Sequence, residues 1–313
     1  MEEIKMVLEI DSDGAPYVMW GKNKMKLENM PLTEKSYKEK AAKELREEPE
    51  IVKAALEELR QLLRGEASLT VPIDNDEFLM KFLRPCKFYA ESAFKRIKAY
   101  YKFRLAYSEH CFDLRPGSVR STFEKSIVSV LSPRDQHGRR ILLVQSENWN
   151  PRDVPLTEVF RGIQVALEAA IVEPRTQVCG VVTILDMRGL SFAQIMQFTP
   201  SFAKMMVDWI QDCVPIRLKA VHVINQPYIF NMLFAVFKPF LREKLRSRIH
   251  FHGSSKPALL AHIEESALRK RHGGTLPEPD VPGELLIKCL LHYEDQFKLV
   301  NSYGYVNSSK SKS

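Results

Sequence analysis

The sequence lacks any apolar run long enough to cross a membrane. A membrane-spanning helix needs roughly 18 to 20 predominantly apolar residues, whereas the longest candidate, residues 228–237, is about half that length and contains Asn231. The N-terminus, MEEIKMVLEI, has acidic residues where a secretory signal requires a basic segment. We therefore expect a cytoplasmic protein.

Cysteine is scarce and shows no pattern. The five cysteines are an odd number without CxxC spacing, which argues against a disulfide framework. Reduced thiols of a cytosolic protein are the simplest interpretation. The positions are Cys86, Cys111, Cys179, Cys213 and Cys289.

Signatures of the common enzyme classes are missing as well. The chain contains no GxSxG, GxGxxG, GK[ST] or HExxH motif and no kinase catalytic loop. Asp186 follows a predicted strand, where α/β folds place reactive groups, but we interpret it as a cap of the next element. We therefore expect no catalytic residue and no cofactor, and a protein that is not an enzyme.

His250 and His252 are the one pair that suggests a metal site. Residues two apart on a strand point to the same face, so both rings could reach one ion. No third Cys or His ligand is evident nearby in the sequence. We therefore interpret the pair as structural and expect no metal.

Positive charge, in contrast, is present in excess. The formal net charge of +7 and the pI near 9.0 favour nucleic acid, an anionic membrane or a phosphorylated head group as partner. Residues 81–104 interleave basic and aromatic side chains, as nucleic-acid-binding segments do. However, Phe94, Ile97, Tyr101 and Leu105 form one helical stripe, which indicates a helix that buries its aromatics. We expect no nucleic-acid partner.

The order of patterns predicts two parts of different class. Residues 31–110 read as amphipathic helices, after a flexible lead-in over residues 1–30. Short β-branched runs then alternate with helical segments, which indicates a largely parallel sheet covered by helices. The predicted strands are residues 141–148, 178–187, 218–225 and 247–253. A last helix and a disordered tail follow over residues 276–313.

Residues 225–253, NQPYIFNMLFAVFKPFLREKLRSRIHFHG, are the most informative segment. Asn225 can cap a helix with Pro227 in its first turn, and the apolar residues that follow cover every side of that helix. Leaving about three or four of them in water would cost several kcal/mol, so something must cover the second face. Protein core is one solution; a lipid surface or a ligand is the other.

The neighbouring charges favour the second solution. Arg217 and Lys219 precede the segment, and a basic series follows its apolar part, opposed only by Glu243. An apolar helix beside cations suits a membrane surface, where the side chains enter the acyl boundary and the cations meet anionic head groups. A gate over an apolar pocket would use the same helix. The series is Lys238, Arg242, Lys244, Arg246 and Arg248.

Several segments together resemble the CRAL-TRIO lipid-transfer family. They are FLMKFLRPCKFYAESAFKRIKAYYKFR, NWNP, VFRGIQ, ILDMRGLSFAQIMQFTPSFAKMM, PIRLKAVHVINQPYIFNMLFAVFKPFLREKLRSRIHFHG and LRKRHGGTLPE, in order from about residue 40 to 280. The resemblance implies an α/β fold with an N-terminal helical lobe (31–110) and a CRAL-TRIO lipid-binding domain (120–275). In that domain a mostly parallel sheet floors an apolar pocket gated by a helix.

The resemblance also implies site residues, matched position by position to a tocopherol-binding member. The pocket positions are Phe160, Ile163, Leu167, Val181, Thr183, Leu185, Leu190, Met206, Ile210 and Val221. The gate positions are Phe192, Met196, Ile229, Leu233, Val236, Phe237 and Leu241. The phosphoinositide-binding cations are Arg217, Lys219, Lys244 and Arg248.

This sequence departs from the tocopherol-binding member at two places in the site. A family arginine is Cys86 here, and the adjacent Lys87 is the candidate replacement. Ile163 and Leu167 are apolar where the tocopherol-binding member is polar, so tocopherol itself is not carried over. We expect a monomeric carrier of one hydrophobic lipid, such as a retinoid, tocopherol or carotenoid. It would exchange its cargo at endosomal or plasma membranes that contain phosphatidylinositol bisphosphates. The alternative is a phosphoinositide-binding adaptor without cargo.

Overall fold

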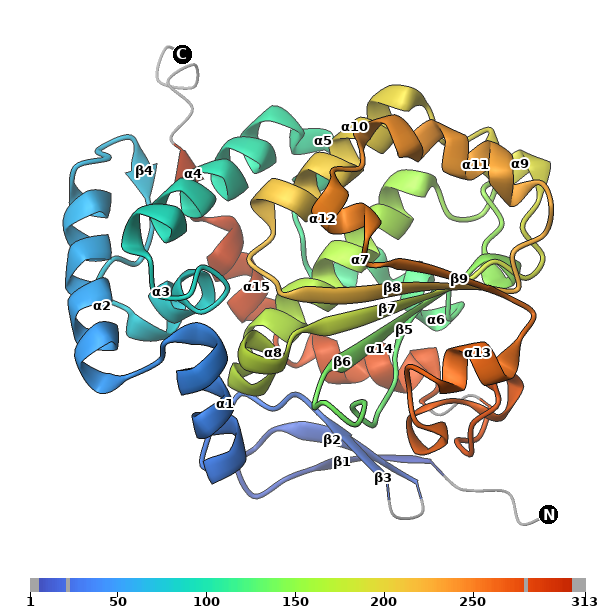
Figure 1. Ribbon diagram of the computed structural model, residues 1–313, viewed down its shortest axis with the longest axis horizontal. Coiled ribbons are helices and arrows are strands. Elements are labelled where there is room, and N and C mark those ends of the chain that lie inside the picture. The colour runs from blue at the N-terminus through green and yellow to red at the C-terminus, as the bar shows by residue number, and fades with distance from the viewer. Residues whose placement is uncertain (1–5, 21–22, 279–280, 306–313) are drawn as a thin grey trace.

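The N-terminal lobe is helical, as predicted. The computed structural model describes residues 6–20, 23–278 and 281–305, and the lobe lies on the left of Figure 1. Asn75 begins one of its helices by accepting a hydrogen bond from the Phe78 N–H at 3.0 Å. The apolar helix faces form one core around Leu79 and Ile97. The helices are α1 (Lys35–Leu45), α2 (Pro49–Arg64), α3 (Asp76–Leu83) and α4 (Ala90–Ala106).

A five-stranded sheet organises the second part. Its order is β5-β6-β7-β8-β9; β5 runs antiparallel to β6, and the remaining neighbours are parallel. The strands are β5 (Val128–Val130), β6 (Arg140–Gln145), β7 (Val181–Asp186), β8 (Leu218–Ile224) and β9 (Ile249–Gly253). The predicted α/β class with a mostly parallel sheet is therefore confirmed.

Helices cover both faces of this sheet. Figure 1 shows most of them above the sheet and α13 (Lys256–Leu260) below it. Strand β8 alternates accordingly, because successive side chains point to opposite faces: Val221 and Val223 point up, and Ile224 packs below. The helices above are α7 (Leu156–Ile171), α9 (Phe192–Ile195), α10 (Pro200–Asp208), α11 (Phe230–Phe237) and α12 (Glu243–Arg246).

Short elements connect these layers. The helical ones are α5 (Ser108–Cys111), α6 (Arg120–Glu124) and α8 (Pro174–Cys179), and a π-helical turn, Trp209–Cys213, extends α10. Single 3-10 turns occupy Pro116–Val119, Ser146–Asn148, Lys238–Phe240, Glu265–Ala267 and Lys270–His272. The strand predicted from residue 178 begins only at Val181. Residues 178 and 179 belong to α8, and this helix ends at Gly180, whose backbone has a φ of 92°. No helix in the described ranges is long and apolar enough to cross a bilayer.

The lead-in differs from the flexible segment predicted for residues 1–30. Within the described residues it forms an antiparallel sheet of β1 (Val7–Ile10), β2 (Pro16–Trp20) and β3 (Asn23–Lys26). Val18 and Met25 are buried, and β2 packs against α14 (Gly283–Leu291). The sequence showed few periodic apolar positions here because the cover comes from a helix more than 250 residues away.

A buried ion network fixes this sheet to the main domain. Glu28 lies 2.8 Å from Arg134, and its N–H donates to Glu173 at 3.0 Å. Glu173 is fully buried and accepts from both Arg134 and Arg140. Burial alone would raise the pKa of Glu173, but the two guanidinium groups lower it to about 2. The carboxylate is therefore ionised whenever the protein is folded near neutral pH.

The C-terminal segment returns to the helical lobe. After α14, helix α15 (Glu294–Asn301) leads to β10 (Gly304–Tyr305), which pairs antiparallel with β4 (Leu69–Thr70). The start of the predicted disordered tail is thus a strand in this structure. The rest of that prediction concerns residues 306–313, which lie outside the described residues.

Candidate functional site

A closed apolar cavity lies between the upper face of the sheet and the helices above it. Its volume is about 220 Å³. Gln145 and Ser146 are the polar residues among the described ones that line it, and Gln145 already accepts from Arg269 at 2.8 Å. Small-molecule sites usually measure about 300–1,000 Å³, so a cargo larger than this space requires the cover to move. The lining of the cavity is therefore suited to an apolar molecule.

Most of the predicted pocket residues reach this cavity. Phe160 and Ile163 come from α7, Leu185 from β7, Leu190 from the turn after it, and Val221 from β8. Met206 and Ile210 come from α10 and the π-helical turn that follows it.

The remaining predicted pocket residues do not line the cavity. Leu167 and Val181 are buried in the main core instead, and Thr183 is half-buried on β7. On β7 the cavity borders Leu185 but not Thr183, which precedes it on the same face. The cavity is therefore confined to the carboxyl end of this strand.

Helix α11 closes the cavity. Phe230 and Leu233 are buried against Met187, Leu190, Ile195 and Val223, whereas Tyr228 is 90% exposed and Met232 50% exposed. One helix thus presents apolar side chains both to the interior and to solvent. This is the two-faced arrangement that its all-round apolar sequence predicted.

The predicted gate residues divide between these two faces. Leu233, Phe237 and Leu241 line the cavity, and Ile229 packs in the cluster below α11. Val236 is half-buried.

Phe192 of α9 and Met196, the residue after that helix, are also predicted gate residues and are exposed at 58% and 63%. Figure 1 places α9 beside α11, and Ile195 of α9 packs in the cluster that holds α11. Together with Tyr228 and Met232 they form an exposed apolar patch, called the gate patch below.

Asn225 is not the helix cap that the sequence predicted, because α11 begins only at Phe230 and Ile229 is the residue before it. Asn225 adopts a left-handed backbone, with φ of 52°, and its side-chain amide donates to Asp186 at 2.8 Å. Asp186 is buried and is also bonded to His272 at 3.0 Å and to the N–H of Arg188 at 3.2 Å. Asn225 therefore anchors the start of the gate segment to the end of β7.

The charge state of this anchor follows from its contacts. Burial alone would raise the pKa of Asp186, but the bonds from His272 and Asn225 outweigh it and lower that pKa. Asp186 is therefore an ionised, fully bonded carboxylate. This arrangement agrees with a cap and turn role rather than a reactive one.

Three predicted head-group cations gather at the start of β8 and β9. Arg217 donates to Glu44 of α1 at 2.7 Å, and Lys219 lies 3.4 Å from the same carboxylate. Burial lowers the pKa of Lys219 and of Arg248, and the charge of Arg217 lowers both further. These cations therefore repel one another across a short distance, and among the described residues only Glu44 pairs with them.

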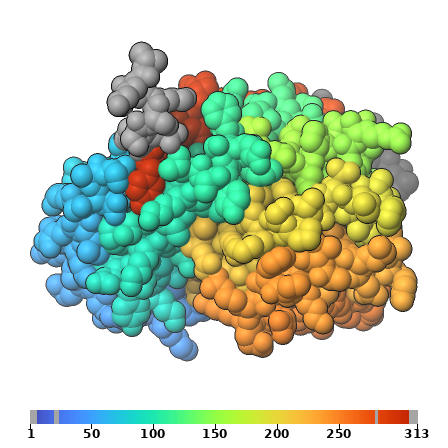
Figure 2. Space-filling view, turned by 90° about the horizontal axis from the view of Figure 1, so that it is seen from above, coloured from blue at the N-terminus to red at the C-terminus, as the bar shows by residue number. Residues whose placement is uncertain are grey.

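Lys244 and Lys87 extend this group toward the helical lobe. Both are exposed and have no ion pair within the described part of the chain. The charge of Lys244 acts on the thiol of Cys86, so α12 faces the loop between α3 and α4. In Figure 2 the surface of the helical lobe adjoins that of the gate segment. Burial raises the pKa of Cys86, which keeps it a neutral thiol where the family has an arginine.

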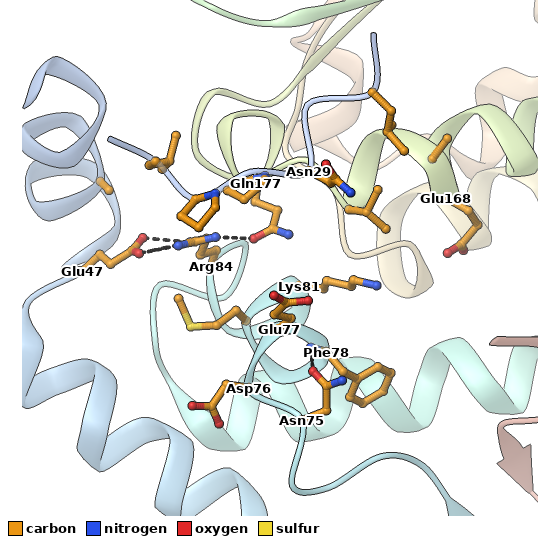
Figure 3. A pocket seen from close by; sticks show the side chains of 18 of the residues that line it. Asn29, Glu47, Asn75, Asp76, Glu77, Phe78, Lys81, Arg84, Glu168 and Gln177 are labelled. Carbon is orange, nitrogen blue, oxygen red and sulfur yellow. Dashed lines mark hydrogen bonds and ion pairs between the residues drawn. The ribbon is translucent and has the colours of Figure 1, made fainter. Parts of the chain in front are cut away.

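A second, larger cavity of about 1020 Å³ lies between the helical lobe, α7, α8 and α15. Figure 3 shows Lys81 pointing toward Glu168 and Arg84 held by Glu47 and Gln177. Burial lowers the pKa of Lys81, against the charge of Glu168. None of the predicted pocket residues lines this space. Its lining mixes apolar side chains with charged ones, whereas no charged residue lines the smaller cavity within the described part of the chain.

Several cavity residues were not identified from the sequence. Phe198 lies in the loop before α10 and Phe202 lies in α10; their rings meet in a T-shaped arrangement with centroids 6.0 Å apart, and Phe198 also meets Phe237 of the gate at 5.6 Å. Because Phe198 is outside the helix, helical spacing could not have indicated a shared face. Trp149 and Leu245 carried no such signal, because their elements are short.

Comparison with known proteins agrees with this geometry. A model of the CRAL/TRIO domain matches residues 124–274. Alpha-tocopherol transfer protein-like of Homo sapiens is 36% identical over 259 residues, covering 82% of this chain and 75% of the relative. Clavesin-1 of Mus musculus is 33% identical over 246 residues, covering 78% and 69%. The crystal structure of Sfh5 aligns with 79% of this chain and 89% of its own at 13% identity, with a TM-score of 0.42, too weak a likeness to support an argument.

An apolar cavity between a sheet and a covering helix is the kind of site that takes an apolar small molecule. The chain belongs to the CRAL/TRIO family, whose members generally bind or transfer lipids. The resemblance inferred from the sequence is thereby confirmed.

Proposed function

We propose that this protein is a non-enzymatic carrier of one small hydrophobic lipid, of retinoid, tocopherol or carotenoid type. The observation that carries the proposal is the apolar cavity closed by a helix with a second, exposed apolar face. A static core would not need that exposed face. A helix that leaves the cavity and enters a membrane would need it.

Exchange then follows from a shift between two states. In the closed state Phe230 and Leu233 stay buried and the gate patch is exposed to solvent. In the open state the membrane covers the apolar side chains of α11. A membrane that binds the open state better than the closed state shifts the population toward release. Association with the membrane is transient, because cargo loading restores the closed state.

The cations would direct this exchange to membranes that contain phosphoinositides. Lys244 and Lys87 are exposed, whereas Arg217 and Lys219 are held by Glu44. A phosphorylated head group would replace Glu44 and relieve the mutual repulsion of the cations. Glu44 thereby acts as an internal competitor of the head group.

The cargo is tested by native mass spectrometry and solvent extraction of the purified protein. A carrier copurifies with stoichiometric lipid. Phe237→Asp, which places a charge in the cavity wall, should abolish copurification, and Lys53→Glu, an exposed charge change on α2, should leave it intact. A protein that never retains lipid, even after incubation with retinoid or tocopherol, would contradict the carrier function.

Head-group binding is tested by vesicle flotation. Lys244→Glu should weaken binding to vesicles with phosphatidylinositol bisphosphate, and Glu44→Gln should strengthen it by freeing Arg217 and Lys219. Lys53→Glu again serves as the charge control. Equal binding of all three variants would refute the role of these cations.

The second candidate function is a phosphoinositide-binding adaptor without cargo. One observation favours it: the cavity of about 220 Å³ is smaller than typical ligand sites of about 300–1,000 Å³. The adaptor would bind phosphoinositide vesicles in flotation and yield no lipid on extraction, which separates it from the carrier.

A further inference from the structure

Half of the histidines in the chain lie in one cluster on the sheet face opposite the cavity. The sequence has eight histidines, and four of them meet around β8 and β9. His222 is on β8, His250 and His252 are on β9, and His262 follows α13. Ring centroids lie 4.9 to 5.4 Å apart between most partners, and 6.3 Å between His250 and His252.

The cluster is a stack of rings rather than a ligand sphere. The planes of His222, His250 and His252 differ by only 21° to 29°. A ring nitrogen of His222 and one of His252 are engaged with each other in a hydrogen bond of 2.9 Å. No three His, Cys, Asp or Glu residues within the described ranges are arranged to hold a metal ion. The chemistry left to this cluster is proton binding.

Protonation is disfavoured as long as the stack is closed. His222 is 2% exposed and shares one hydrogen bond of 2.9 Å with His252. Burial lowers the pKa of His222 to about 3, with help from the other three rings and from Arg139. Burial and neighbouring rings also lower the pKa of His250 and of His252.

The neighbouring elements add few charges that would counter this effect. The turn before β6 carries Asp135 and exposed His137; Asp135 lies 3.7 Å from Arg139, so its charge is matched there. Helix α13 and its flanks contribute Lys256 and Glu264, both exposed. The resolved electrostatic effects on the three strand histidines all come from positive or imidazole groups.

The same strand touches the gate on its other face. Ile249 of β9 lines the cavity, and Phe251 meets Phe230 at 6.0 Å and Phe234 at 5.1 Å. Strand β9 is the edge of the sheet and pairs only with β8 within the described residues. A disturbance of β9 therefore reaches α11 directly.

We propose that the four histidines form an acid-operated latch: the neutral stack holds β9 on β8, and its protonation frees β9 together with the gate helix. The consequence for cargo release rests on the proposed carrier function. An anionic membrane concentrates protons at its surface, so the latch would open where exchange takes place.

The sign and size of the effect follow from linkage. A lowered pKa means that the closed state is fully favoured above the ordinary histidine pKa of 6.5, and that this preference is lost as the pH falls toward 3. At pH 5.5 an opened His222 with its ordinary pKa is about ten-elevenths protonated, whereas the closed one is neutral. His222 alone therefore raises the opening equilibrium about tenfold between pH 7.4 and pH 5.5.

Hydrogen exchange of the full-length, lipid-free protein tests the latch. After correction for intrinsic rates, protection of β9 and α11 amides should fall about tenfold at pH 5.5 in the wild type. In His222→Gln, which keeps a polar partner for His252, the fall should be several times smaller. His292→Gln, an exposed histidine outside the cluster, is the matched control and should behave as the wild type. An unchanged response in His222→Gln, or no response in the wild type, would overturn the proposal.

A second measurement applies if His222→Gln does not fold. In a histidine-selective NMR titration of the wild type, His222, His250 and His252 should titrate below the ordinary histidine pKa of 6.5, since burial lowers the pKa of each; titration of all three at the ordinary pKa would refute the latch. Both measurements use protein without cargo. If β9 responds to acid in a protein that never retains lipid, the carrier function fails and the latch remains.

Discussion

Truncation of Leu233, a buried residue of α11, gives the sharpest test of a gate helix that is either closed or open. Leu233 is 8% exposed and packs in the cluster of Met187, Leu190, Ile195 and Val223. Leu233→Ala removes these contacts from the closed state, but an open gate does not make them. The variant should therefore destabilise closure selectively.

The magnitude follows from the burial. Leu to Ala substitutions in cores cost about 2–5 kcal/mol, and a site beside a cavity that can contract falls at the lower end, about 2–3 kcal/mol. A tenfold change corresponds to about 1.4 kcal/mol, so the open population should rise about 30-fold to 150-fold. The release rate should rise by a similar factor if opening precedes release.

Stopped-flow transfer of a fluorescent retinoid or tocopherol analogue to vesicles measures this rate. Met232→Ala is the matched control, because Met232 is on the same helix but 50% exposed and should change the rate little. Denaturant unfolding gives the global free energy of each variant. A Leu233→Ala protein that unfolds more easily yet releases lipid at the wild-type rate would refute the gate, since Leu233 would then be equally buried in both states.

Three further predictions concern stability, cargo and the anchor of the gate segment. Glu173→Gln should lower the free energy of unfolding by about 3–5 kcal/mol, because it removes the buried carboxylate that pairs with Arg140. The wild type should lose this contribution as the pH falls from 4.5 toward 2, and denaturant unfolding across that pH range measures the loss. Ile163→Trp should fill the cavity and abolish lipid copurification, whereas Thr183→Val, on β7 outside the cavity, should retain it. Asn225→Val should cost about 1–2 kcal/mol for the left-handed backbone, in addition to the lost bond to Asp186, and should accelerate release in the same stopped-flow assay. An unchanged rate would show that this anchor does not hold the gate closed.

Much of the fold was predictable because its signals are local. The β-branched runs around Leu143, Ile184 and Val223 are almost fully buried, so they appear in the sequence as continuous apolar segments. The lead-in around Val18 was not predictable, since its burial comes from a helix near the other end of the chain. A short strand covered from such a distance leaves little pattern in its own sequence.

The candidate site shows the same division. The family resemblance named Ile163, Thr183 and Leu185 together as pocket positions, and of these Ile163 and Leu185 line the cavity whereas Thr183 does not. Thr183 and Leu185 lie on the same strand, β7, but the cavity borders only the carboxyl end of that strand. Where a void ends depends on how helices from distant segments pack, which residue-by-residue transfer does not specify.

The sequence by itself determined that α11 is apolar on every side and flanked by cations, because composition and helical period are properties of one short segment. Only the tertiary structure decided which face of that helix covers the cavity and which face remains exposed to solvent. It also decided that His222, thirty residues before His252, joins it in one stack with His250 and His262. Two histidines on a strand are a local pattern; four around a sheet edge arise only when parallel strands and the helix that follows them come together, since parallel pairing joins segments far apart in the chain.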